Sequence, residues 1–221
     1  KNMEKSMIER NIAAAIHGRY LVEAPARSPS PLLVGFHGYA EGADQQLQRL
    51  QAIPGSEQWI RVAVQGLHRF YRGRSRGVVA SWMTSQDREL AIADNVDYVG
   101  RVVRAVADEW GASPAVVFSG FSQGVAMAFR AAAGSAIPVR GVIVCGADVP
   151  PEMDANALSR VPAALLGRGT SDEWYTEERF AADERRLRDA GVAVQVLRFE
   201  AGHEWTAAFS RAAGQFLAAL K

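Results

Sequence analysis

Short apolar runs alternate with longer amphipathic segments along the chain. Runs such as 31–36 and 142–145 are too short for buried helices and are typical of strands that are covered on both faces. Segment 87–110 instead repeats apolar residues at helical spacing, which predicts an amphipathic helix. The apolar stripe of that segment is formed by Ile92, Val96, Val99, Val103 and Val106.

The same pattern predicts an alternation of strands and helices over most of the sequence. Strands are expected at 17–23, 31–36, 60–64, 115–118, 142–145, 163–166 and 192–199, and helices at 44–53, 87–110, 123–133, 174–190 and 205–220. The basic, glycine-containing segment 69–77 is expected to be a loop. Such alternation predicts an α/β fold with a mostly parallel, doubly wound sheet and helices on both faces. Ligands of such sheets bind beyond the carboxyl ends of the strands.

Length and composition fit one globular domain over residues 1–221. Hydrophobic residues make up 48% of the chain and charged residues 22%, which is close to the average for globular proteins. The Pro- and Ser-rich segment 24–31 is short, so we interpret it as a loop between strands. No insertion in the pattern is long enough to build a separate lid domain.

The charge balance gives no reason to expect nucleic acid or a membrane surface as the main partner. The formal net charge is +1, from 25 basic and 24 acidic side chains. No apolar run approaches the length of a membrane span. Cys145 is the one cysteine of the sequence, which rules out an intrachain disulfide and fits the cytoplasm best. A disulfide-free periplasmic protein and the removal of an N-terminal targeting segment remain alternatives.

The strongest local motif is Gly120-Phe-Ser-Gln-Gly124, which matches the Gly-x-Ser-x-Gly nucleophile elbow. An expected strand precedes it and an expected helix follows it. The elbow needs a sharp turn that lifts the serine hydroxyl out of the sheet, and flanking glycines let strand and helix approach without Cβ clashes. Ser122 is therefore the predicted nucleophile. An ordinary glycine-flanked turn is the alternative interpretation.

The partners of Ser122 are expected in later loops at the same edge of the sheet. His203 lies between the last strand and the last helix and is the predicted general base. Asp172 follows the preceding strand and is the predicted acid that orients His203, with Asp148 as its rival one strand earlier. The chain order of serine, aspartate and histidine is that of α/β-hydrolases.

Two backbone N–H groups are predicted to form an oxyanion hole. One belongs to Gln123 at the start of the elbow helix. The other is expected in the segment His37-Gly-Tyr-Ala-Glu-Gly42, with Tyr39 as the donor. His37 is expected to shape this segment, and a simple turn is the alternative.

These motifs resemble the phospholipase/carboxylesterase family, which includes the acyl-protein thioesterases. The resemblance runs from about Leu32 to the C-terminus and rests on His37-Gly38, the elbow, Val144 to Pro150, Asp172 and Gly202-His203. Three positions depart from the usual family pattern. Val125 replaces a second glycine, Arg168-Gly169 replaces His-Gly, and the loop after Gly38 differs.

Aromatic and basic side chains near the expected site remain open to two interpretations. We assign a substrate pocket to Trp82, Met83, Trp174 and Trp205, of which Trp82 also resembles a tryptophan at the family's pocket wall. The same side chains would serve equally well as core packing. The four arginines of segment 69–76 either attract an anionic substrate or form a solvated loop, which is the interpretation we favour.

The sequence as a whole predicts a serine carboxylesterase with the α/β-hydrolase fold. The resemblance implies a small-molecule ester, thioester or lysophospholipid substrate, hydrolysed through an acyl-enzyme. This chemistry requires neither a metal ion nor an organic cofactor. Amide or peptide cleavage on the same triad and a non-catalytic binding protein of the same fold are the alternatives. Acyl chain length, leaving group and oligomeric state are left open.

Overall fold

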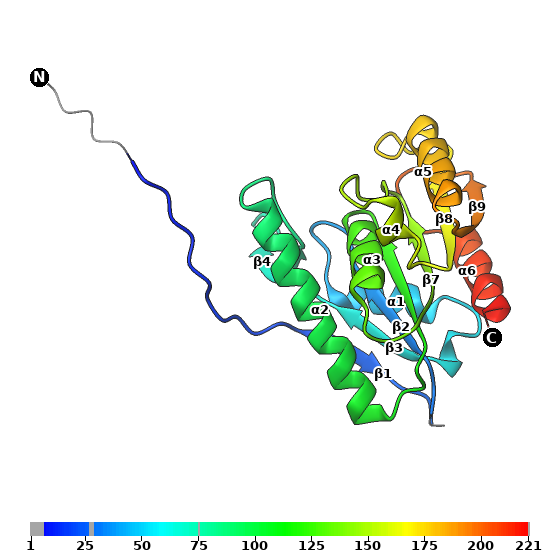
Figure 1. The fold of residues 1–221 in the computed structure, drawn as a ribbon, viewed down its shortest axis with the longest axis horizontal. Coiled ribbons are helices and arrows are strands. Elements are labelled where there is room, and N and C mark those ends of the chain that lie inside the picture. Colours follow the sequence, from blue (N-terminus) through cyan, green and yellow to red (C-terminus); the bar gives the residue numbers. More distant parts are fainter. Residues whose placement is uncertain (1–6, 27–28, 75, 221) are drawn as a thin grey trace, which may run out of the picture.

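A seven-stranded sheet forms the centre of the protein (Figure 1). The structure is a computed structural model and describes residues 7–26, 29–74 and 76–220. The spatial order of the strands is β1-β3-β2-β6-β7-β8-β9. Their bounds are Tyr20–Glu23 (β1), Leu32–Phe36 (β2), Ile60–Val64 (β3), Val116–Phe121 (β6), Val139–Cys145 (β7), Ala163–Gly169 (β8) and Ala193–Phe199 (β9). Only β1 pairs antiparallel in this sheet, which confirms the predicted mostly parallel architecture.

Helices cover both faces of the sheet, as predicted. The helices are α1 (Ala43–Gln51), α2 (Arg88–Trp110), α3 (Gln123–Gly134), α4 (Ala155–Leu158), α5 (Glu177–Asp189) and α6 (Ala207–Ala219), with a 3₁₀ turn at Ser56–Gln58. Buried side chains of α2, α3 and α5 form one core cluster with the sheet. Those of α1 and α6 form the other cluster on the opposite face. The helices α2 and α3 lie side by side in Figure 1.

The central strand β2 is apolar throughout because both of its faces are buried. Successive side chains of a strand point to opposite faces of a sheet. In β2, Leu32, Val34 and Phe36 join the cluster with α2 and α3, whereas Leu33 joins the cluster with α1 and α6. This arrangement explains why the sequence shows continuous apolar runs instead of alternation.

Several predicted elements differ from the structure: α5 begins at Glu177 instead of residue 174, and β6 and β8 each end three residues later than predicted. Segment 69–77 is not simply a loop, because β4 (His68–Tyr71) and β5 (Val78–Ser81) form an antiparallel hairpin around it. All residues of β4 are exposed, so burial imposes no apolar pattern that would reveal the strand. The strand predicted from residue 17 begins at Tyr20, because its partner β3 ends at Val64, opposite that residue.

The parallel strands bring five loops to one edge of the sheet. Strands β2, β6, β7, β8 and β9 all run in the same direction, so their carboxyl ends lie together. The loops that follow these strands contain His37, Ser122, Asp148, Asp172 and His203. Every predicted candidate for the triad and the oxyanion segment therefore follows a strand that ends at this edge.

Candidate active site

Ser122 lies in a strained turn between β6 and α3. Its φ of 51° and ψ of −124° fall in a region that non-glycine residues rarely adopt. A Cβ on Gly120 would lie 2.3 Å from the Gly124 carbonyl oxygen, and one on Gly124 would lie 2.1 Å from the Phe36 carbonyl oxygen. Both glycines are therefore needed for the close approach of α3 to the strands, which is the local geometry that the motif predicts.

His203 lies in the loop between β9 and α6, with its ring against Ser122. The His203 Nε2 is 2.8 Å from the Ser122 Oγ, and the ring packs on Phe121 at a centroid distance of 5.2 Å. The His203 side chain is 26% exposed. It is thus held by packing on one side and open to a ligand on the other.

Asp172 lies in the loop after β8 and contacts the far nitrogen of the same ring. The Asp172 Oδ2 is 2.9 Å from the His203 Nδ1, and the Asp172 Oδ1 accepts hydrogen bonds from the N–H groups of Trp174 and Tyr175 at 2.9 and 3.0 Å. Asp172 is buried. Since the carboxylate accepts, Nδ1 donates, and this leaves Nε2 as the acceptor for the Ser122 hydroxyl.

Asp148, the rival acid, does not reach His203. Its Oδ2 lies 3.2 Å from Nη1 of Arg179 on α5. The structure therefore brings Asp172, and not Asp148, into contact with His203.

The predicted oxyanion segment 37–42 packs directly against Ser122. A Cβ on Gly38 would lie 3.3 Å from the Ser122 Cβ, which is tighter than most Cβ contacts, so the segment packs closely on the serine. The Gly38 N–H donates to the Glu41 Oε2 at 2.8 Å. Ala40 takes the left-handed conformation with φ 57°, although Gly38 and Gly42 are the residues that the sequence marks as flexible.

An ion pair holds Glu41 in this position. Both carboxylate oxygens of Glu41 accept from Arg49 of α1 at 2.6 Å, and the two side chains are 17% and 16% exposed. The Arg49 guanidinium also lies 4.2 Å from the centre of the Phe121 ring, which in turn packs on His203. Burial alone would raise the pKa of Glu41, but the hydrogen bonds and charge of Arg49 outweigh it and leave the pKa lowered. This support was not predicted from the sequence.

His37 is a buried, structural member of the same segment. Its Nε2 accepts from the Gly66 N–H at 2.9 Å, so the proton resides on Nδ1, which donates to the Gly38 carbonyl at 2.7 Å. Burial lowers the pKa of His37 and keeps the ring neutral. The Trp82 Nε1–H donates to the His37 carbonyl at 2.9 Å.

The two predicted oxyanion donors, Gln123 and Tyr39, both lie near Ser122. Gln123 is the first residue of α3, where a backbone N–H has no partner within the helix. Its side chain accepts from the Trp82 N–H at 2.9 Å and donates to the Met83 carbonyl at 3.0 Å, which ties the elbow to the segment after β5. Tyr39 is 61% exposed and borders the cavity beside Ser122.

A cavity of about 560 Å³ opens onto Ser122 and His203. Its other walls are Tyr39, Gly146, Ala147, Asp148, Trp174 and Arg179. Among the four predicted pocket residues only Trp174 lines it, and the assignments of the other three are corrected. Trp82 is fully buried beneath His37, Met83 lies near Arg130 of α3, and Trp205 packs edge-on against Phe209 and donates to Ser210.

Arg168 supports the loop that carries Asp172. This buried side chain at the end of β8 donates to the carbonyl oxygens of Tyr175 (2.6 Å), Thr170 and Asp172 (3.4 Å each), and it pairs with Glu177 at 3.3 Å. The sequence shows an arginine where the family resemblance leads us to expect histidine. Its hydrogen-bond partners could not be predicted from the sequence.

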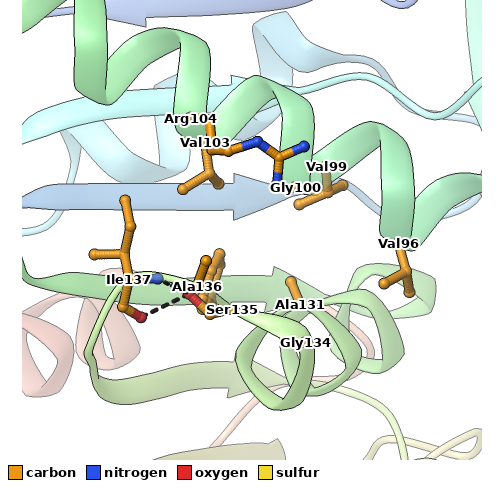
Figure 2. Close-up of a pocket in the computed structure, with 11 residues that line it drawn as sticks. Val96, Val99, Gly100, Val103, Arg104, Ala131, Gly134, Ser135, Ala136 and Ile137 are labelled. Atoms are coloured by element: carbon orange, nitrogen blue, oxygen red, sulfur yellow. Dashed lines mark hydrogen bonds between the residues drawn. The ribbon is translucent and has the colours of Figure 1, made fainter.

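A second cavity lies between α2 and the end of α3, remote from Ser122 at the start of α3 (Figure 2). Its volume of about 30 Å³ is that of roughly one water molecule, and Val96, Val99 and Val103 form most of one wall. Among the described residues we find no cluster of His, Cys, Asp and Glu that could hold a metal ion. No helix in the same part of the chain is long and apolar enough to cross a membrane.

Comparison with known proteins gives one family match and many structural matches. The family model described as phospholipase/carboxylesterase matches residues 17–221. A Bacillus cereus carboxylesterase superposes with a TM-score of 0.71 at 15% identity, covering 92% of this chain and 95% of that one. The acyl-protein thioesterase 2 of Zea mays gives 0.70 at 17% identity, covering 92% and 99%. An esterase named PE8 gives 0.71 at 19% identity, covering 93% and 100%. No protein with a curated description matches the sequence significantly.

Proposed function

The chain belongs to the phospholipase/carboxylesterase family, and from this premise we propose that it is a serine hydrolase that cleaves carboxylic esters through an acyl-enzyme. The observation that carries the proposal is the unbroken hydrogen-bonded series from the Ser122 Oγ through His203 to Asp172, with distances of 2.8 and 2.9 Å. Thioesters and lysophospholipids would be cleaved by the same chemistry.

In the first half-reaction the Ser122 Oγ attacks the ester carbonyl carbon. The Ser122 proton passes to the His203 Nε2, and the Asp172 carboxylate stabilises the imidazolium that results. The carbonyl electrons move to the oxygen, which the backbone N–H groups of Tyr39 and Gln123 stabilise. Collapse of this intermediate expels the alcohol, which takes the proton from His203 and leaves an acyl group on Ser122.

In the second half-reaction water replaces the alcohol. His203 removes a proton from the water molecule, whose oxygen attacks the acyl carbon, and the same two N–H groups stabilise the oxyanion again. Collapse of the second intermediate returns the proton from His203 to the Ser122 Oγ. The products are the free acid and the original enzyme.

A non-catalytic binding protein and an amidase are the competing functions. The strained backbone of Ser122 disfavours a binding protein, because a binding site has no need for a serine in such a conformation. An amidase would use the same residues and would differ by cleaving amides at rates comparable to those of the matching esters.

The test is a comparison of Ser122→Ala with the wild type on p-nitrophenyl esters from short to long acyl chains. We expect the variant to lose on the order of 10⁴- to 10⁶-fold in kcat, since removal of a nucleophile of this kind has such an effect. Labelling by a fluorophosphonate should also be abolished. Ser159→Ala, which changes an exposed serine after α4, is the control and should behave as the wild type. Retention of more than about a tenth of the turnover by Ser122→Ala would refute the mechanism.

A further inference from the structure

The wall of the cavity opposite the triad carries a charged pair. Of the residues that line the cavity, Arg179 is the one with a permanently cationic side chain, and it projects from the first turn of α5. Its Nη1 lies 3.2 Å from the Asp148 Oδ2 and 3.4 Å from the Trp174 carbonyl oxygen. These two contacts fix one corner of the guanidinium at the cavity.

The other edge of the same guanidinium has room for a ligand. Nε and Nη2 of Arg179 make no hydrogen bond to the part of the chain that the structure describes, and the side chain is 60% exposed. An arginine presents two parallel N–H groups that match the two oxygens of a carboxylate. Arg179 is therefore held in place by two contacts and still has N–H groups free to donate to a ligand.

Asp148 orients Arg179 but only partly neutralises it. The Asp148 side chain is 44% exposed, and an ion pair this open to solvent is weak, so an incoming anion competes with it readily. Of the two acids that precede Arg179 on α5, Glu178 is exposed and Glu177 is engaged with Arg198 and Arg168. Asp148 thus has two effects: it positions the Arg179 guanidinium, and its negative charge repels an anionic ligand.

The β4–β5 hairpin adds positive charge at the cavity mouth. Phe70 of the hairpin packs on Tyr39, a cavity wall residue, at a ring distance of 5.7 Å. The hairpin residues 68–81 include no acid and carry four exposed arginines, Arg69, Arg72, Arg74 and Arg76. Clustered charge of one sign near a site attracts ligands of the opposite sign over a distance of about 10 Å at moderate salt.

We propose that this site selects esters whose acyl part carries a carboxylate, with Arg179 as the residue that binds it. The inference rests on the proposed esterase function and narrows its substrate class. The ester carbonyl would lie at Ser122 and the carboxylate at the open edge of Arg179, with the acyl chain between Tyr39 and Trp174.

The test is the ratio of kcat/KM for an anionic ester to that for its neutral counterpart. Mono-4-nitrophenyl adipate and suberate are compared with 4-nitrophenyl hexanoate and octanoate, after subtraction of spontaneous hydrolysis. Because both esters of a pair release the same leaving group, the ratio cancels changes in the catalytic machinery and in the fraction of active enzyme. Arg179→Gln should lower the ratio about fivefold, as expected for a partly exposed ion pair. Arg179→Lys should lower it less.

Two further variants make the result specific. Asp148→Asn should raise the ratio about twofold or more, because a competing carboxylate is removed. Arg101→Gln changes the net charge equally at a remote, exposed position of α2 and should leave the ratio unchanged. A ratio in Arg179→Gln that is within twofold of the wild type, or higher, would overturn the inference. That outcome leaves the esterase proposal intact if Ser122→Ala is still inactive, whereas an active Ser122→Ala refutes the esterase proposal itself.

Discussion

Two loops flank Ser122 and are held in opposite ways. The oxyanion segment 37–42 is fixed by a carboxylate, since Glu41 accepts from the Gly38 N–H and from both ends of the Arg49 guanidinium. The acid loop 170–175 is fixed by a cation, since Arg168 donates to three of its backbone carbonyls. The first support depends on a carboxylate, which acid can protonate, and the second depends on backbone carbonyls, which do not titrate.

In the proposed mechanism, the difference follows from what each loop offers to the reaction. A loop that presents N–H donors to an oxyanion needs an acceptor to hold its remaining N–H groups. A loop that presents a carboxylate to His203 needs a donor to hold its remaining carbonyls. The loop that displays N–H donors is therefore held by an acceptor, Glu41, and the loop that displays a carboxylate is held by a donor, Arg168.

The largest effect is expected when the displayed group of the acid loop is removed. Asp172→Asn should lower kcat on the order of 10³- to 10⁴-fold, because an amide at this place favours the wrong imidazole tautomer. Asp148→Asn is the matched control and should change kcat for a neutral ester only a few-fold. Steady-state kinetics on one activated ester measures both. The reverse ranking would make Asp148 the acid.

Removal of the cation that supports the acid loop should mainly reduce stability. Arg168→Met leaves three carbonyls without their donor and should lower the free energy of unfolding by about 2–3 kcal/mol in urea denaturation. Arg198→Met removes an exposed partner of the same Glu177 and should cost less than about 1 kcal/mol. Equal losses for the two variants would mean that the carbonyl contacts are not what holds the loop.

Weakening of the ion pair at the oxyanion segment should mainly reduce turnover. In Glu41→Gln the Gly38 N–H keeps an acceptor but the charged pair with Arg49 is lost, so the Tyr39 N–H is held less firmly toward the oxyanion. We expect kcat to fall about tenfold with KM within twofold of the wild type, because this contact strengthens only in the transition state. Glu57→Gln, an exposed acid, is the control. An increase in KM alone would assign Glu41 to substrate binding instead.

The two supports should also respond differently to acid. The folded state lowers the pKa of Glu41 below its ordinary value of 4.5, so the folded protein binds fewer protons there than the unfolded chain. The stability that wild type gains over Glu41→Gln, about 1 kcal/mol, is therefore fully present above pH 4.5 and is lost as the pH falls through the folded pKa. Urea titrations between pH 3 and 7 measure this. The difference in free energy of unfolding between wild type and Arg168→Met should change little over the same pH range. A similar loss at low pH for both differences would contradict the comparison.

The smallest effect is expected away from both loops. Gly100 lies inside α2 beside the small cavity of Figure 2, and a Cβ there would meet only Arg104 Nη1 at 3.6 Å. Gly100→Ala should therefore stabilise the protein by about 0.5–1 kcal/mol with unchanged kcat, since alanine favours helix. Gly124→Ala is the contrasting variant, because its Cβ would lie 2.1 Å from the Phe36 carbonyl oxygen. A loss of stability in Gly100→Ala would mean that α2 cannot accept a side chain at this position.

The order of most strands and helices, and the residues at their junctions, could be predicted from the amino-acid sequence alone. Burial on both faces leaves apolar runs such as 31–36, and helical spacing leaves the stripe of α2, so these elements were predictable to within a few residues. A parallel sheet collects the carboxyl ends of its strands at one edge, which made Ser122, Asp172 and His203 candidates before any contact was known. The hairpin β4–β5 was missed because β4 is exposed along its whole length and no burial pattern marks that strand.

Which side chains touch could not be predicted in this way, because contacts arise only when the elements pack in three dimensions. Glu41 and Arg49, Arg168 and Tyr175, and Arg179 and Asp148 meet through the docking of separate elements, and a charged residue in a sequence carries no mark of its partner. The same holds for the pocket, because Trp82 packs against His37 and Trp205 packs against Phe209 instead of lining the cavity. Hydrophobic periodicity is a local signal. A contact between side chains instead depends on the relative placement of elements far apart in the chain, and this placement is set by how the elements pack.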